Sequence, residues 1–139
     1  MKKIFLLAIA FVSFATVTSC DKDDDAQASL EGKWELSKTG IAGSGQEALT
    51  DYEHQEGCAK DFVMINATTF ADHTFFGTTC EEDITTATYT RSGNTLTVTE
   101  GTETYTMEIK TLDGNTLKLY ATSPDLPGLT GVAVYTKAN

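Results

Sequence analysis

The chain has 139 residues, of which 10 are Lys or Arg and 20 are Asp or Glu, so its net charge is −10. The length corresponds to one domain, since domains typically contain about 100–150 residues. Hydrophobic residues make up 40% of the chain, which excludes a disordered protein. The acidic balance argues against nucleic-acid binding, because neutralising phosphates requires a clustered basic surface.

Residues 1–19 have the pattern of an export leader. Lys2 and Lys3 precede an apolar run over 4–17, which is too short for a permanent membrane-spanning helix. The run ends in Val17-Thr18-Ser19-Cys20, which resembles the lipobox of bacterial lipoproteins, where the chain is cut before the cysteine and the thiol is lipidated. We therefore expect a signal peptide over 1–19 and a lipid anchor on Cys20. Loss of the two lysines changes the net charge from −10 to −12.

Residues 20–29 carry a run of charges. Asp21-Lys22-Asp23-Asp24-Asp25 cannot bury apolar surface, so we expect a flexible tether. The segment resembles the acidic stretch that sends lipoproteins of Bacteroidetes-type bacteria to the cell surface. The resemblance implies a lipid-anchored protein of the outer membrane, exposed at the cell surface. A plain solubilising linker is the alternative.

Two cysteines, Cys58 and Cys80, remain once Cys20 is assigned to the lipid. Disulfides persist in exported proteins, so we expect these two to form a bridge. The alternatives are two free thiols or a metal site completed by His54 or His73. These spacings match no zinc pattern, and no metal is expected.

From residue 30 onward the sequence predicts β-strands. The 22 threonines after the leader favour a pleated, half-exposed surface. Apolar and polar residues alternate most clearly over 95–99 and 105–110, and short turns such as Ser92-Gly93-Asn94 make consecutive strands antiparallel neighbours. The eight expected strands cover residues 32–38, 60–70, 74–80, 84–91, 95–99, 105–110, 117–119 and 131–136.

Other segments are less regular. The spacing over Gln46–His54 predicts a short helix, and 39–57 and 122–128 are expected to be lid or contact loops. Direct pairing of the cysteines would centre the second hairpin near Thr69, whereas Asp72-His73 has the better turn chemistry. A bulge, or a cysteine placed in a loop, would reconcile the two.

Eight short strands in a meander leave two open edges unless the sheet closes. The predicted fold class is therefore all-β, an eight-stranded up-and-down antiparallel β-barrel over residues 30–139. A barrel of this size either fills its interior with side chains or holds one small ligand. The residues expected to face inward are Trp34, Leu36, Tyr89, Leu96, Val98, Tyr105, Met107, Ile109, Leu117, Leu119, Val132 and Val134.

The first strand opens with Gly32-Lys33-Trp34, which looks like the first-strand signature of lipocalins, where the tryptophan plugs the closed end of the barrel. The later cysteine pair and the run Ser92–Val98 look like the lipocalin-like domains of Bacteroidetes lipoproteins. This resemblance covers residues 30–137 and implies a lipocalin-like, calycin-type barrel.

Two features depart from the lipocalin pattern. Thr50-Asp51-Tyr52 spells the second lipocalin motif but lies too early in the chain, so we treat it as a chance match. The arginine that stacks over the tryptophan near the last strand is absent. Lys137 is the cation that the sequence offers in its place, without the planar guanidinium.

The resemblance implies that the barrel binds a small hydrophobic or amphipathic ligand. The candidate contacts inside the barrel are Trp34, Tyr89, Tyr105, Met107 and Leu119, and the two tyrosines come first because a buried phenol needs a hydrogen-bond partner. No cofactor is expected. No enzyme is expected either, because no nucleophile lies in a recognisable catalytic motif.

A second hypothesis is an interaction protein. Small lipid-anchored barrels with one disulfide also resemble membrane-bound lysozyme inhibitors, which present loops to a protein partner. Here the acidic charge would attract a cationic protein partner.

Overall fold

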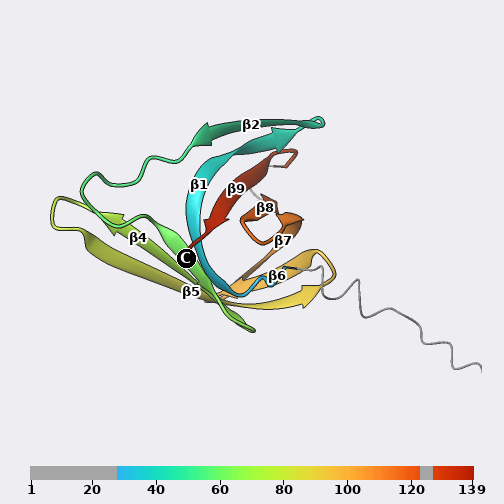
Figure 1. Cartoon of the computed structure of the whole chain (residues 1–139). Coiled ribbons are helices and arrows are strands. Elements are labelled where there is room, and N and C mark those ends of the chain that lie inside the picture. Colours follow the sequence, from blue (N-terminus) through green and yellow to red (C-terminus); the bar gives the residue numbers. More distant parts are fainter. Residues whose placement is uncertain (1–27, 123–126) are drawn as a thin grey trace, which may run out of the picture.

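The computed structural model describes residues 28–122 and 127–139, which form a single antiparallel sheet (Figure 1). The predicted signal peptide, the predicted lipidation site Cys20 and most of the predicted tether lie outside these residues. In the described part of the chain, no helix is long and apolar enough to cross a membrane. The strands are β1 (Gly32–Gly43), β2 (Gln46–Asp51), β3 (Phe62–Ile65), β4 (Thr69–Phe76), β5 (Glu81–Ser92), β6 (Thr95–Glu100), β7 (Glu103–Leu112), β8 (Thr116–Thr122) and β9 (Thr130–Lys137).

The sheet closes on itself. Strands β3 to β9 follow β1 in sequence order, and β9 pairs back onto β1 from Trp34↔Lys137 to Ala42↔Thr130. Eight antiparallel strands therefore form a ring, which confirms the predicted eight-stranded up-and-down barrel. Closure satisfies the two strand edges that an open meander would expose.

A ninth strand, β2, lies where a short helix was predicted, so that prediction was wrong. The first strand continues past Lys38 to Gly43, and the chain reverses through Ser44 and Gly45, whose φ angles are 51° and 78°. Two consecutive positive φ values make the tight turn that matches the twist of a hairpin. Most of the expected 39–57 loop is thus a β-hairpin.

The β1–β2 hairpin depends on a close backbone approach at Gly40. A Cβ atom on Gly40 would lie 1.9 Å from the carbonyl oxygen of Ala48, so only glycine fits. The carboxylate of Glu47 accepts hydrogen bonds from the Tyr120 hydroxyl and, at 3.0 Å, from Lys118 Nζ. These contacts hold the hairpin against the outer face of β8.

The hairpin β3–β4 turns at residues 66–68. Asn66 Oδ1 accepts the backbone N–H groups of Thr68 and Thr69, at 3.1 and 2.9 Å, which stabilises the reversal. The turn predicted at Asp72-His73 is wrong, because both residues lie within β4 and pair with β5.

The hydrophobic core fills one end of the barrel, which we call the closed end. Trp34, Leu96 and Leu117 are completely buried there, and Leu30 covers them from outside the first strand. Trp34 Nε1 donates to the Leu30 carbonyl at 2.8 Å. Lys137 Nζ lies 4.2 Å from the centre of the Trp34 ring, so this lysine takes the place expected for the missing arginine.

Candidate functional site

The inner face of the barrel changes character along its axis. At the closed end, Phe70, Ala87 and Leu96 are buried. Farther along β4 and β5, the inward-facing Asp72, which pairs with Thr85, is exposed to solvent, and so is Thr85. Strand β6 pairs with β5 only from Thr88 onward, so Asp72 and Thr85 lie where this part of the sheet extends past the ring and its inner face meets water. We call this second region the open end.

The predicted ligand contacts divide between these two regions. Trp34 and Leu119 lie in the buried core. Tyr89 belongs there too, since its ring packs edge-on against Phe70 at 4.8 Å and its hydroxyl donates to the Asn66 carbonyl at 2.6 Å. The phenol of Tyr89 thus already has a partner within the fold.

Tyr105 and Met107, by contrast, lie where the core meets the open end. Both are partly buried and pack against the core cluster. Tyr105 pairs with Val98, so its ring stands on the inner face above the buried layer. Of the five predicted contacts, these two have side chains that solvent reaches in part.

The last strand presents a different face inward from the one predicted. Leu117 pairs with Tyr135 and Leu119 with Ala133, so these residues of β9 share the inner face. Val134 stands on the opposite face, and so does Val132, which is buried outside the core cluster. The prediction that Val132 and Val134 face inward was therefore wrong, and Tyr135 was missed.

Tyr135 packs against the core cluster, as Tyr105 does, and pairs with the buried Leu117. Burial raises the pKa of the Tyr135 phenol, and the nearby Asp72 carboxylate and Tyr105 phenol raise it further. Burial also raises the pKa of Tyr105, with smaller contributions from Glu100 and Asp72. The Asp72 carboxylate thus raises the pKa of one phenol on β7 and of one on β9, and all three residues belong to the inner face.

Carboxylates dominate the wall of the open end. Loss of surrounding water raises the pKa of Asp72, and the carboxylates of Asp61, Glu100 and Asp83 add to this increase. The imidazole of His73 acts in the opposite direction, but its side chain points outward, where its ring stacks on Phe62 at 4.3 Å. The lining is therefore amphipathic, with phenol rings and negative charge.

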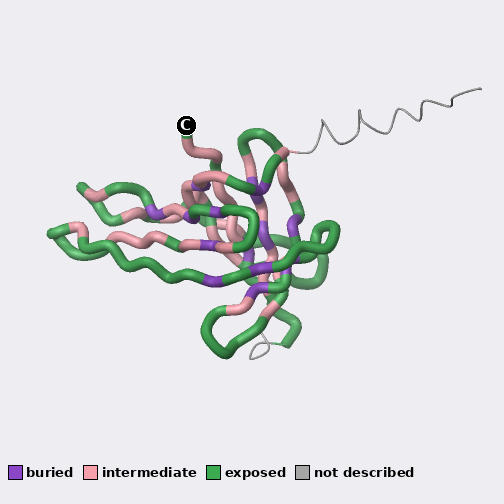
Figure 2. The backbone as a smooth tube through the Cα atoms, turned by 90° about the horizontal axis from the view of Figure 1, so that it is seen from below, coloured by how far each residue is buried: buried purple, intermediate pink, exposed green. Residues whose placement is uncertain are grey.

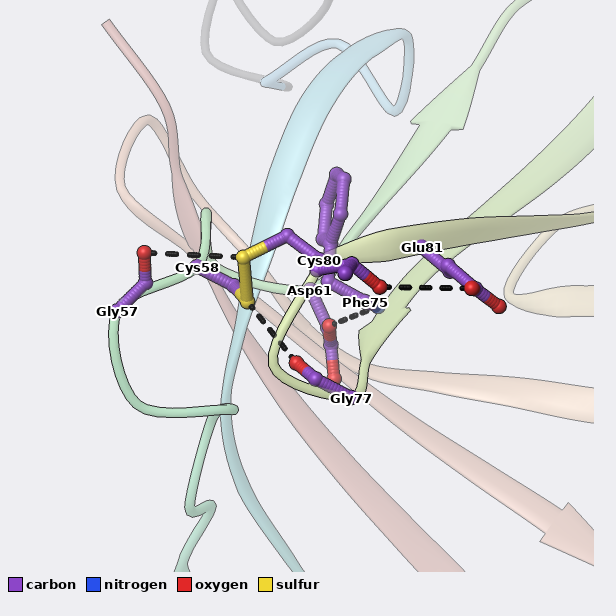
Figure 3. Close-up of a disulfide and its surroundings, with 8 residues drawn as sticks. Gly57, Cys58, Asp61, Phe75, Gly77, Cys80 and Glu81 are labelled. Atoms are coloured by element: carbon purple, nitrogen blue, oxygen red, sulfur yellow. Dashed lines mark hydrogen bonds between the residues drawn. A yellow bond between two sulfur atoms is a disulfide. The ribbon is translucent and has the colours of Figure 1, made fainter.

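A buried carboxylate, Asp61, fixes the segment that leads from β2 to β3. Its Oδ1 accepts the Phe75 N–H at 2.8 Å (Figure 3), and its Oδ2 accepts the Tyr52 hydroxyl at 2.6 Å. The hydrogen bond to Asp61, together with burial, raises the pKa of Tyr52 to about 12. His54 Nδ1 accepts the Asp61 N–H at 3.0 Å. This histidine, which the sequence offered as a metal ligand in the alternative to a disulfide, thus has a structural contact.

The disulfide joins the segment that precedes β3 to the turn between β4 and β5. Cys58 and Cys80 are bonded, with their Cα atoms 5.4 Å apart, which confirms the predicted bridge (Figure 3). Both cysteines lie outside the strands, Cys58 before β3 and Cys80 in the turn between β4 and β5. This placement in loops resolves the conflict between cysteine spacing and hairpin register.

The described residues also form a groove on the outer surface. Its volume is about 500 Å³, and it runs between the β1–β2 hairpin and β8, beside Glu47, Tyr120 and Thr130. None of the predicted ligand contacts lines this groove. Within residues 28–122 and 127–139, no three His, Cys, Asp or Glu side chains are grouped so that they could hold a metal ion.

The sequence did not predict that Asp72 and Tyr135 lie on the inner face, or that Asp61 fixes the segment between β2 and β3. The one available signal was the position of Asp72 two residues after the buried Phe70, which by alternation puts it on the same face. Against that signal, aspartate is a frequent turn residue, which favoured a turn at this position.

Comparison with known proteins identifies this architecture. The family model described as "Lipocalin-like domain" matches residues 30–119. Among solved structures, a lipocalin-like protein from Bacteroides uniformis ATCC 8492 is 14% identical, with 78% of this chain and 98% of that chain covered, at a TM-score of 0.53. An uncharacterized protein from Bacteroides eggerthii DSM 20697 is 12% identical, with 79% and 100% covered, at the same TM-score of 0.53. No curated protein matches the chain.

Proposed function

Because the chain belongs to the lipocalin-like domain family, we propose that it binds one small amphipathic molecule inside the open end of the barrel. The observation that carries this proposal is the change along the inner face, from buried Leu96 and Trp34 to solvent-exposed Asp72 and Thr85. The apolar layer below them offers a floor for a hydrocarbon or ring system.

The polar groups of the open end set the preferred head group. Asp72 and Glu100 supply negative charge, and the phenols of Tyr105 and Tyr135 supply hydrogen-bonding hydroxyls and ring faces. A cation gains both charge attraction and contact with an aromatic ring, whereas a carboxylate or sulfate would be repelled. We therefore expect a neutral or cationic head group to be preferred over an anionic one.

We also propose that the barrel is held at the outer membrane by lipid on Cys20. The Val17-Thr18-Ser19-Cys20 sequence supports this, as does the acidic run that follows it. Stable attachment needs more than one acyl chain, as a lipoprotein anchor supplies. Metabolic labelling with an alkyne fatty acid in the source cell is expected to mark the chain. A Cys20→Ala variant should not be labelled, and labelling of that variant would contradict the anchor.

Ligand binding is tested with two amphiphiles that share one tail. Dodecyltrimethylammonium and dodecyl sulfate, each below its micelle-forming concentration, are titrated into the chain and followed by tyrosine fluorescence and native mass spectrometry. We expect a 1:1 complex with the cation and at least about tenfold weaker binding of the anion, a difference of about 1.4 kcal/mol.

Two neighbouring threonines supply a matched pair of variants. Thr85 faces inward and Thr86 faces outward on the same exposed stretch of β5. Thr85→Trp fills the open end and should weaken binding, whereas Thr86→Trp should leave it unchanged. Equal binding by both variants, or the absence of any 1:1 complex, would overturn the proposed function. Native mass spectrometry of protein extracted from the source cell then identifies the natural ligand.

A further inference from the structure

Strand β5 extends beyond its neighbour on one side. It pairs with β4 from Glu81 to Thr88, but with β6 only from Thr88 to Ser92. Among the described residues, no strand pairs with the other edge of residues 81–87. Together with residues 70–76 of β4 this stretch forms a projection, which we call the β4–β5 arm; β3 flanks β4 as far as His73, and the arm is two-stranded beyond it (Figure 1).

The direction of the backbone groups on this edge follows from one hydrogen bond. Tyr89 donates its N–H to the Thr68 carbonyl at 2.8 Å, on the β4 side of the strand. Backbone groups of successive residues in a strand point to opposite edges. The N–H and C=O groups of Glu82, Ile84 and Thr86 are therefore directed away from β4, toward the free edge.

Neither face of β5 is covered before Ala87. Residues 81–86 are all exposed, including inward-facing and outward-facing members (Figure 2). Ile84 is 51% exposed on the outer face, and Phe76, opposite Glu81 at the tip, is 49% exposed. An edge strand with open faces and exposed apolar side chains can accept another strand by β-addition.

The arm is held in a fixed conformation. The Cys58–Cys80 disulfide ties its tip to the segment before β3, and Asp61 accepts the Phe75 N–H from β4. A strand that is already ordered loses less conformational freedom on binding than a flexible loop would. The edge is thus preorganised to receive a partner.

The charge of the arm selects the partner. Glu81, Glu82 and Asp83 follow one another on β5, and residues 69–90 contain no lysine or arginine; their one histidine, His73, lies with its Nδ1 2.7 Å from Glu82 Oε1. Pairing of β5 with a second copy of itself would bring two such acidic strands together, in a chain whose net charge is −10. A strand that carries lysine or arginine would instead place cations opposite these carboxylates.

We propose that the free edge of β5 is an interaction surface that binds an extended, basic segment of a protein partner as an additional antiparallel strand. Backbone hydrogen bonds to Glu82, Ile84 and Thr86 supply the pairing, and the neighbouring carboxylates supply the preference for basic side chains. This surface uses the backbone groups of Glu82, Ile84 and Thr86, whereas the ligand site uses inward-facing side chains, so each proposal can fail without the other.

The probe for this proposal is a capped decapeptide that alternates lysine with valine, titrated into the full chain at low salt. Binding is followed by calorimetry and by amide hydrogen exchange. We expect slower exchange at Glu82, Ile84 and Thr86, and no change on β7 or β8. A peptide of the same sequence, methylated on the backbone nitrogens that face β5, should bind at least about tenfold more weakly, because it loses several hydrogen bonds of about 1 kcal/mol each.

Variants of the chain separate hydrogen bonding from charge. Ile84→Pro removes an N–H from the free edge without removing a hydrogen bond to β4, and it should weaken binding, whereas Ile84→Thr keeps the N–H and serves as its control. Glu82→Gln with Asp83→Asn should weaken binding about tenfold, a loss in the range for two close charge pairs. Glu31→Gln with Glu108→Gln changes the net charge equally at two exposed positions away from the arm and should have little effect.

Three results would overturn the proposal. The first is equal binding of the methylated peptide, which would mean non-specific charge attraction. The second is slower amide exchange at residues 82–86 in the chain alone as its concentration rises, which would identify a second copy as the occupant. The third is the absence of peptide binding to the unmodified chain. This test does not depend on whether a variant folds.

Discussion

The two ends of the barrel are built from the same strands but by different means. At the closed end, Trp34, Leu96 and Leu117 are fully buried, and apolar packing holds the strands together. At the open end, inward-facing Asp72 and Thr85 are exposed, and the rim is held by a disulfide and by the hydrogen bonds of Asp61. The difference indicates that one end supplies most of the stability and the other leaves room for function.

The largest effect is expected at the closed end. Trp34→Ala removes a completely buried indole, its hydrogen bond to Leu30 and its contact with Lys137, and should lower the free energy of unfolding by about 3–5 kcal/mol. Urea denaturation measures the loss. Tyr105→Ala at the border of the open end should cost clearly less. Equal losses would contradict the division between the two ends.

The next largest loss in the free energy of unfolding is expected on removal of the disulfide. Replacing Cys58 and Cys80 by alanine releases a loop of 22 residues, which by the chain-entropy model costs about 3 kcal/mol. Hydrogen exchange should accelerate most in the β4–β5 arm and least around Trp34. Uniform acceleration over the whole barrel would show that the rim and the core unfold as one unit.

A smaller loss is expected at the buried carboxylate. Asp61→Ala leaves the Tyr52 hydroxyl and the Phe75 N–H without their acceptor, at a cost of about 2 kcal/mol. The pKa of Tyr52, raised to about 12 mainly by this hydrogen bond, should fall toward 10, and ultraviolet absorbance during a pH titration measures it. Asp61→Asn keeps an acceptor and should cost less. An unchanged Tyr52 pKa in Asp61→Ala would contradict the assigned cause.

The smallest expected effect is a gain in the free energy of unfolding, whereas the three preceding changes lower it. The pKa of Asp72 is raised above its ordinary value of 3.8, so its protonated form is favoured in the folded state. Its contribution to stability is present below pH 3.8 and is lost as the pH rises through the higher folded-state pKa. Asp72→Asn should therefore match the natural chain at low pH and exceed it at neutral pH, by less than about 1 kcal/mol because water reaches the carboxylate.

Thermal unfolding followed at several pH values checks this result. Ser92→Ala, at an exposed turn position, serves as the control without a titrating group. A lower stability of Asp72→Asn at neutral pH would mean that the carboxylate makes a favourable contact inside the barrel.

The sequence predicted the closed end better than the open end, and the reason is physical. Leu96 and Val98, or Leu117 and Leu119, alternate with polar residues, so their strands have one face that must be buried. In β9 the residues 132–135 are all apolar, so alternation could not decide which of them face inward. The register with β8 shows that Ala133 and Tyr135 do.

At the open end, the alternation of apolar and polar residues no longer distinguishes the inner face from the outer face. An inner face that contacts water can carry polar residues. Asp72 is therefore a residue type that is common in turns, although it lies within a strand. Strand β2 escaped prediction for a related reason, since five of its six residues are exposed and it has no apolar face. The Ser44-Gly45 turn and the close approach at Gly40 define it instead.

The account depends most on where an amphiphile binds. Intermolecular nuclear Overhauser effects between dodecyltrimethylammonium and the aromatic protons of the chain measure this directly. We predict contacts between the tail or head group and the rings of Tyr105 and Tyr135, both on the inner face. Contacts confined to Tyr120, in the groove on the outer surface, would contradict the claim that the open end of the barrel is the binding site.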